Sequence, residues 1–366
     1  MKRINLEVLM LLVLVASIAG AETTAQSTTV DCNKGQSLNS TLAKLNKLTA
    51  NTVTVSGTCT EFVQVVGFEN LTLNGLAGAT LVQPTTGAGS VFNSLLFIES
   101  SRSVYVDGFS IQADTITVPA VGIGHGSSDI RLRHLNIQGG TFGISIFEHS
   151  QVSIAYVTAQ DPGFSTLGVF DLSDVHVERS AFTSSTGTSY QVGLFVGASH
   201  ITMYDTTITN MAVGIEGYAG SIIDVLVFTT YYSNSVPSDV VIDSPAGTNY
   251  NGVAISGGGS LNVSTANLVI NKPGQTYGGT TGGVLISDDA SMTTSDGDLV
   301  IAGSNGQGVM ALNNSHATLI GATVTSSHGG LVAANLSSID VSVGTTLTLV
   351  VGKNVDLFCD PDSTIT

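Results

Sequence analysis

The sequence predicts an all-β protein, a single-stranded right-handed parallel β-helix (solenoid) with a short N-terminal capping helix. Five similar segments, VYVDGFSI, IRLRHLNI, VSIAYVTA, VHVERSAF and ITMYDTTI, begin at positions 104, 130, 152, 175 and 201, and a repeat of this length indicates a solenoid. Within each segment apolar or small residues alternate with polar ones, which is the period of a strand. Gly, Ser, Asn and Asp separate the segments and suit tight corners. An antiparallel sandwich would not keep all of these strands in one frame.

The same frame continues along the rest of the chain, at Leu261, Met292, Ala317 and Ile339. Between Ile222 and Leu261 an insertion from about Val227 to Tyr250 lengthens the repeat. A second column of short apolar strands, each introduced by Gly, precedes these segments and starts at positions 122, 143, 168, 193, 214, 252, 283 and 308. Two or three strands per coil would bury one continuous core, because each coil packs on its neighbours.

Composition excludes several classes of protein. The chain has 27 acidic and 11 basic residues, a formal net charge of −16, and 42% hydrophobic residues. It is therefore neither a disordered chain nor a nucleic-acid-binding protein. Beyond the N-terminus no apolar run reaches the length that spans a membrane.

The first 21 residues have the pattern of a secretory signal peptide. Lys2 and Arg3 form a positive start, residues 9–18 are apolar, and residues 19–21 (Ala-Gly-Ala) form a cleavage site. A retained membrane anchor is the alternative, but the apolar stretch is short for a span. We therefore expect a secreted, periplasmic or cell-surface protein with no transmembrane segment in the mature chain.

The ends of the rod complete the predicted organisation. In residues 22–60, a predicted N-terminal cap, Leu38, Leu42, Leu45 and Leu48 have helical spacing. Such a helix would cover the first coil, which otherwise exposes core and unpaired strand edges. The coils are predicted over residues 61–350, and residues 351–366 form a C-terminal cap or tail.

The N-terminal segments VDCNKGQSLNSTLAKL, NTVTVSGTCTEFVQV and NLTLNGLAGATL carry a family resemblance. They resemble the start of secreted bacterial right-handed parallel β-helix proteins of the pectate-lyase-like superfamily, in which a capping helix leads into the first coils. That superfamily contains polysaccharide lyases, glycoside hydrolases, epimerases, esterases and members without known activity. The resemblance implies an extracellular glycan as the partner and leaves the reaction open, because fold does not assign function.

Cysteine placement predicts one disulfide. Cys32 and Cys59 flank the capping helix and, in an exported protein, would link it to the first coil; two free buried thiols are the alternative. Cys359 lies about eleven coils further on, on the order of 50 Å away at ~4.8 Å per strand, so it cannot pair with either. The three do not form a zinc site.

Known catalytic motifs are incomplete. Residues 124–126 (Gly-His-Gly) resemble a polygalacturonase tripeptide, but the Asn-Thr-Asp and Arg-Ile-Lys partners of that family are missing, and the sequence favours a corner His between glycines over a catalytic one. No Gly-Gly-x-Gly-x-Asp calcium repeat is present. We predict no cofactor and no metal, with calcium left open in the absence of a motif.

Charged side chains gather at outward places of the stacked segments. Arg131 or Arg133 would bind a uronate carboxylate and His176 or Glu178 would handle protons. The candidate catalytic residues are Arg133, His176 and Glu178. The predicted substrate-binding residues are Arg131, Arg133, Tyr156, Tyr204, Asp205 and Tyr231. The alternative is a set of surface ion pairs, Asp107 with Arg133 and Arg179 with Asp205, one coil apart.

Aromatic residues form two further sets. Phe147, Phe170, Phe195 and Tyr218 stand near equivalent places of the Gly-led strands and are predicted to form a ladder in the core. Tyr231, Tyr232, Tyr250 and Tyr277 lie in longer insertions, where tyrosine rings could stack on sugars.

These observations predict an exported β-helix protein that binds or acts on an extracellular polysaccharide. The alternative is a non-catalytic surface, adhesion or structural rod. Whether the chain is an enzyme stays open; an enzyme of this family would be a polysaccharide lyase or a glycoside hydrolase.

Overall fold

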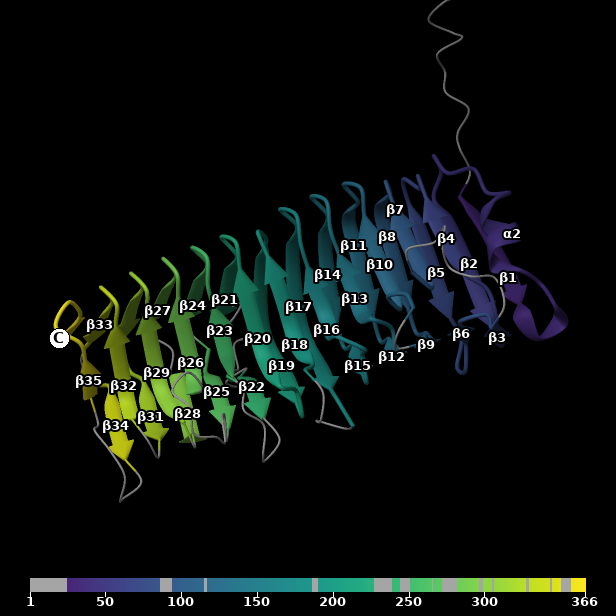
Figure 1. Cartoon of the computed structure of the whole chain (residues 1–366). Helices are drawn as coiled ribbons and strands as arrows, with labels where there is room; N and C mark the ends of the chain where they lie inside the picture. The colour runs from purple at the N-terminus through teal and green to yellow at the C-terminus, as the bar shows by residue number, and fades with distance from the viewer. Residues whose placement is uncertain are drawn as a thin grey trace, which may run out of the picture.

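The computed structural model shows a parallel β-solenoid whose coils run from the N-terminal cap to the C-terminus (Figure 1). It describes residues 25–85, 94–114, 117–185, 190–226, 239–243, 251–264, 266–271, 282–295, 299–304, 306–326, 329–342, 344–349 and 357–366. Every strand pair in these residues is parallel, so the predicted solenoid is confirmed and the antiparallel sandwich is excluded.

Each coil gives one strand to a 12-stranded sheet. Its strands are β4 (Val63–Val66), β7 (Leu96–Glu99), β10 (Val121–Gly124), β13 (Phe142–Ile146), β16 (Ser165–Val169), β18 (Val192–Gly197), β20 (Val213–Tyr218), β23 (Val253–Ile255), β26 (Gly282–Ser287), β29 (Gln307–Leu312), β32 (Gly329–Ala334) and β35 (Leu357–Cys359). Hydrogen bonds join them in this order along the rod.

The remaining strands form a 24-stranded sheet that bends at a corner within each coil. They are β1 (Gln26–Asp31), β2 (Asn51–Ser56), β3 (Thr58–Cys59), β5 (Leu71–Gly75), β6 (Thr80–Val82), β8 (Arg102–Asp107), β9 (Ser110–Gln112), β11 (Ser128–Arg133), β12 (Asn136–Gln138), β14 (Gln151–Ala155), β15 (Thr158–Gln160), β17 (Asp174–Thr183), β19 (His200–Thr209), β21 (Ile222–Leu226), β22 (Val240–Asp243), β24 (Ser260–Ser264), β25 (Leu268–Asn271), β27 (Ser291–Ser295), β28 (Leu299–Ser304), β30 (His316–Leu319), β31 (Thr323–Ser326), β33 (Ser338–Val341), β34 (Thr346–Leu349) and β36 (Thr364–Ile365).

Strand register confirms the predicted repeat. Ile130 pairs with Val104 on one side and with Val152 on the other, and all three point into the core. One position of the frame is wrong: Ile201 pairs with Ile223, which is fully buried, whereas Ile222 is 43% exposed. Inward Val, Ile and Leu of successive coils form a single continuous core, as stacked coils require.

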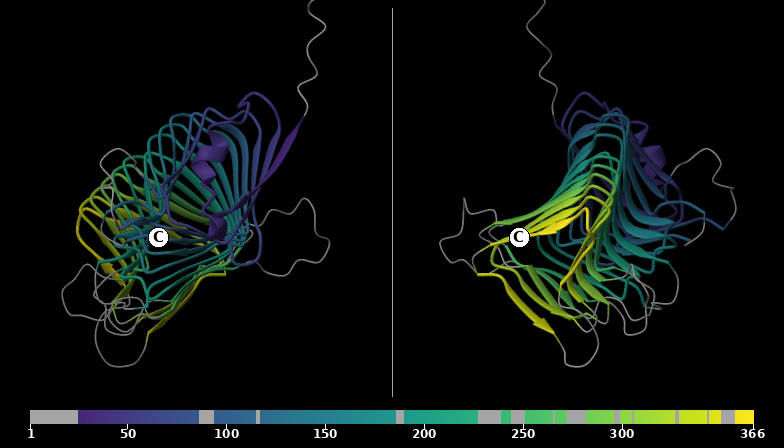
Figure 2. Two further views of the ribbon diagram at one scale, coloured as in Figure 1. Left: turned by 90° about the vertical axis from the view of Figure 1, so that its right-hand side faces the viewer. Right: turned by 60° about the vertical axis from the view of Figure 1, so that its left-hand side comes forward.

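A short helical segment covers the N-terminal end of the coils (Figure 2, left). It consists of the 3₁₀ helix η1 (Cys32–Lys34) and the helix α2 (Leu38–Leu42), whose Leu38 and Leu42 are buried. The helix is shorter than the leucine spacing predicts. After Leu42 the backbone tightens into a turn, with Leu45 N–H donating to Leu42 C=O, and Leu48 is 74% exposed instead of packing on the core.

The side chain of Asn39 forms hydrogen bonds with the outer edge of β4, the N-terminal end strand of the 12-stranded sheet. Its Oδ1 accepts from the backbone N–H of Gln64 at 2.9 Å, and its amide donates to the carbonyl of Phe62. The side-chain amide thus replaces the peptide of a preceding strand, which protects an edge that would otherwise pair with another chain.

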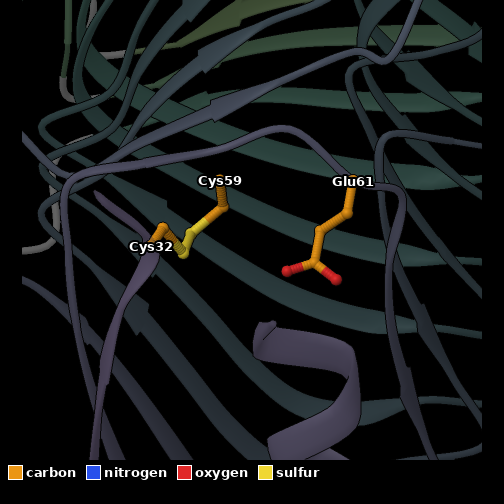
Figure 3. A group of neighbouring side chains, drawn as sticks. All are labelled: Cys32, Cys59 and Glu61. Atoms are coloured by element: carbon orange, nitrogen blue, oxygen red, sulfur yellow. A yellow bond between two sulfur atoms is a disulfide. The ribbon is translucent and has the colours of Figure 1, made fainter. Parts of the chain in front are cut away.

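The disulfide predicted between Cys32 and Cys59 is present, with a Cα–Cα distance of 5.1 Å, and Cys359 is unpaired and exposed. Glu61 lies beside this disulfide (Figure 3). Its carboxylate accepts from the Ser37 hydroxyl at 2.7 Å and from the N–H of Leu38 at 2.6 Å. Cys32, Cys59 and Glu61 thus have a structural role. The disulfide links η1 to β3, and Glu61 accepts from N–H groups at the start of α2, which have no partner within the helix.

Replacing Glu61 with alanine is expected to lower the free energy of unfolding by about 1.5–3 kcal/mol, because a charged acceptor is removed from the start of α2. Urea denaturation measures the loss. Glu69→Ala is the matched control, since Glu69 is exposed and uses its backbone N–H in bonding to Lys47. Equal stability of the two variants would contradict this assignment.

Candidate functional site

Those residues of the predicted glycan site that the structure describes lie together on the 24-stranded sheet. Register places Arg131 beside Ser153 and His176, and Arg133 in line with Ala155, Glu178 and Tyr204. We call this surface the charged face; it comprises Arg131, Arg133, Tyr156, His176, Glu178, Arg179, Tyr204 and Asp205. Its corner residues are in the left-handed region, with φ of 56° at Tyr156, 46° at Arg179 and 46° at Asp205.

Ion pairs of the charged face follow the predicted ladder only in part. Arg179 lies 3.7 Å from Asp205, as predicted. Asp107, expected to pair with Arg133, instead contacts Nδ1 of His134 at 2.8 Å and accepts from the Tyr105 hydroxyl. His134, at the corner after β11, therefore forms the contact with Asp107 that was expected of Arg133.

Tyr156 is the centre of the charged face. The guanidinium groups of Arg133 and Arg179 lie 5.5 and 5.4 Å from its ring centroid, and the ring of His134 stacks on it at 5.1 Å. Arg179 also donates to the Tyr156 hydroxyl. Cation–π and hydrogen-bond contacts thus hold these side chains on one another.

The residues predicted to handle protons, His176 and Glu178, adjoin Tyr204. The Tyr204 hydroxyl donates to Glu178, and the rings of His176 and Tyr204 are 5.2 Å apart. Burial lowers the pKa of His176, and the charges of Glu178 and Asp174 act in the opposite direction. Ala155, which lies between Arg133 and Glu178 in the same column, is only 3% exposed.

Several predicted elements lie outside the described residues. They are the signal peptide of residues 1–21, the substrate-binding candidate Tyr231, and Tyr232, Tyr250 and Tyr277. Among the described residues, no helix has the length and apolar character needed to cross a membrane.

The phenylalanine set does not form the predicted core ladder. The inward places of β16 and β18 are occupied by Leu167, Val169, Leu194 and Val196, all fully buried. Alternation along a strand therefore turns Phe195 outward. Phe147, Phe170 and Phe195 are partly exposed and Tyr218 is 36% exposed, so these rings lie on the outer surface of the 12-stranded sheet.

Three of these rings, Phe170, Phe195 and Tyr218, belong to a group of six that are in contact across neighbouring coils. Phe170 lies 5.7 Å from Phe142 and 5.7 Å from Phe195, and Phe195 lies 5.1 Å from both Phe164 and Tyr218. The sixth ring, Tyr190, is 6.3 Å from Phe164 and 44% exposed. We call this surface the aromatic face; it comprises Phe142, Phe164, Phe170, Tyr190, Phe195 and Tyr218.

Glycines at outward places make room for the rings. A Cβ on Gly168 would lie 2.7 Å from the Phe170 ring, and a Cβ on Gly197 would lie 2.6 Å from Tyr218. Register pairs Gly168 with Phe195 and Gly197 with Tyr218, so large and small residues alternate between coils. The sequence signal is a Gly-x-Phe in one coil (168–170) followed by a Phe-x-Gly in the next (195–197).

A smaller group of rings lies further toward the N-terminus on the same sheet. Phe97 and Phe147 stack at 6.2 Å, and His125 contacts both rings edge-on. Glu148 lies 2.5 Å and Glu99 3.5 Å from the nitrogens of His125. The Gly-His-Gly tripeptide thus places its His between two carboxylates of adjacent coils, at a corner where φ of His125 is 53°.

Comparisons with known proteins support no family assignment. No protein-family model matches the sequence, and no characterised protein matches it by sequence. Similar solved structures include the catalytic domain of a GH87 α-1,3-glucanase in complex with nigerose, at 12% identity and TM-score 0.49, covering 93% of this chain and 68% of that one. Another is PfbA, a surface adhesin of Streptococcus pneumoniae, at 11% identity and TM-score 0.44, covering 90% and 88%.

Pectate lyase Bsp165PelA from Bacillus sp. N165, in complex with trigalacturonate, is also similar, at 10% identity and TM-score 0.34, covering 62% of this chain and 84% of that one. A pectate lyase is thus among the similar structures, as the resemblance at the N-terminus led us to expect. Similarity at this level concerns fold alone. The chain is a parallel β-solenoid, as its own strand pairing shows.

Proposed function

We propose that the protein is exported and binds an extracellular polysaccharide, with sugar rings stacked on the aromatic face. The observation that carries the proposal is the set of six contacting rings on an outer sheet surface. Contiguous exposed apolar surface on a protein marks a binding site, and aromatic rings offer sugars an apolar face with little loss of conformational freedom.

The extent of the aromatic face favours a polymer over a single sugar. Its residues belong to or adjoin β13, β16, β18 and β20, four successive strands of the 12-stranded sheet. At ~4.8 Å between strands, the first and last are ~14 Å apart. Linked sugars can contact several rings together, and each further contact is then intramolecular and adds to the affinity.

The disulfide supports the proposed export. Cys32 and Cys59 are linked at the cap, and structural disulfides form and persist in oxidising compartments outside the cytoplasm. This agrees with the secretory signal predicted in residues 1–21.

Affinity electrophoresis of the purified protein through gels that contain neutral, acidic or amino-sugar polysaccharides tests the proposal. We expect retardation in at least one gel. Shortened polymer after incubation would assign an activity, and unchanged polymer would assign a non-catalytic adhesion or structural role. Migration unaffected by every polysaccharide would overturn the proposed function.

The charged face is a second candidate surface, suited to acidic sugars. Arg133 is half-buried, its guanidinium lies 5.5 Å from the centroid of the Tyr156 ring, and a guanidinium suits a uronate carboxylate because it can bind it with two parallel hydrogen bonds. Under this alternative, Arg133→Ala is expected to weaken binding of a polyuronate by about 1.5–3 kcal/mol. Arg102→Ala, at an exposed position of β8, is the control; equal affinities of the two variants would exclude Arg133 from binding.

A further inference from the structure

The charges around the aromatic face are of one sign. In its described strands the 12-stranded sheet contains no Lys and no Arg, and its charged residues are Glu99 and Glu216. The four described arginines lie on the 24-stranded sheet, in β8, β11 and β17, and the described lysines lie in residues 34–47 of the cap. The sheet that carries the aromatic face is therefore acidic within a chain of formal net charge −16.

Glu216 stands directly beside the rings. Register pairs it with Phe195, and its carboxylate accepts from the Tyr190 hydroxyl at 2.7 Å. Asp171, exposed at the corner after Phe170, is the second carboxylate. Asp171 precedes Leu172, whose N–H donates to Ala198, and the N–H of Ala198 donates to Tyr218, so these corners are stacked. Burial raises the pKa of Tyr218, and the negative charges of Asp171 and Glu216 raise it further.

From this arrangement we infer that the aromatic face binds a polysaccharide whose sugars carry ammonium groups, a polymer of amino sugars with free amines. The inference rests on the proposed function and names its ligand class. An ammonium group is attracted to the face of an aromatic ring and forms a charge-assisted hydrogen bond with a carboxylate beside that ring. A uronate polymer would place its carboxylates against Glu216 and Asp171 and would be repelled. An uncharged polymer would stack on the rings without any gain from the carboxylates.

The test compares three oligosaccharide probes by isothermal titration calorimetry at low ionic strength: a glucosamine hexamer, the same hexamer fully N-acetylated, and a galacturonate hexamer. Each is titrated into wild-type protein, Phe195→Ala and Glu216→Gln. We expect the glucosamine hexamer to bind at least tenfold more tightly than the acetylated hexamer, and this ratio to shrink as salt screens the charges. Phe195→Ala should weaken both hexamers.

Glu216→Gln separates the inference from the proposed function. It should weaken binding of the glucosamine hexamer several-fold more than binding of the acetylated hexamer, so the preference for the glucosamine hexamer shrinks. Asp171→Asn, at an exposed corner, is a second variant with the same expected direction should the first fail to fold. Binding of galacturonate at equal affinity, with the same dependence on Phe195, would overturn the inference and keep the proposed function.

A lysine decamer serves as the control for charge alone. If the decamer binds as tightly as the glucosamine hexamer and Phe195→Ala changes neither affinity, binding depends on charge alone. That result would overturn both the inference and the proposed function. No binding of any sugar probe would overturn the proposed function itself.

Discussion

Replacing Phe195 with alanine is expected to weaken polysaccharide binding about 10- to 100-fold, or about 1.4–2.8 kcal/mol. Phe195 contacts Phe164, Phe170 and Tyr218, each within 5.7 Å between ring centroids, so its loss breaks the face at its centre. Affinity electrophoresis against the best-retained polysaccharide measures the change. The rods should remain folded, because Phe195 lies outside the buried core.

Phe358→Ala is the matched control for that variant. Phe358 is 50% exposed on β35, the last strand of the same sheet, and lies outside the aromatic face. Its removal should leave binding unchanged. If Phe195→Ala and Phe358→Ala bind alike, the sugar does not stack on the aromatic face, and the charged face around Arg133 becomes the leading candidate.

Removing the disulfide with the double substitution Cys32→Ser and Cys59→Ser should cost about 3–4 kcal/mol of stability, because the link closes a loop with a sequence separation of 27 residues. In a solenoid each coil contacts only its neighbours, so the cost should fall on the N-terminal coils. Hydrogen exchange should show loss of protection in residues 25–60 before the central strands respond.

Cys359→Ser is the control, because its thiol is exposed and unpaired. It should leave both stability and exchange unchanged. Protection in residues 25–60 that survives loss of the disulfide would show that α2 and Glu61 hold the cap without it.

The repeat could be predicted from the sequence because inward places of the 24-stranded sheet are occupied by Val, Ile and Leu in a fixed frame, as at Val104, Ile130 and Val152. The aromatic face could not, because alignment of the Gly-led strands by their glycines puts Gly168 with Gly193. The ladder instead pairs Gly168 with Phe195. A Cβ on Gly168 would meet the outward rings of Phe170 and Phe142, whereas a Cβ on Gly193 would meet the buried side chain of Ile208. The true register differs by two residues from the alignment of the glycines, so the sequence did not predict the contact between Gly168 and Phe195.

The charged face shows a second limit. Stacking of the segments placed Arg133 and Glu178 in one column correctly. The partners of these side chains depend on the corners, where Tyr156 and His134 have positive φ of 56° and 47° and turn their rings against each other. That backbone geometry is not encoded in the alternation of apolar residues, so His134 was not expected to take Asp107.

A crystal structure of the protein with a bound amino-sugar hexamer tests the central claim most directly. We predict sugar rings against Phe170, Phe195 and Tyr218, with an amine within hydrogen-bond distance of Glu216. Sugar bound on the charged face between Arg133 and Asp205, with the aromatic face bare, would contradict it.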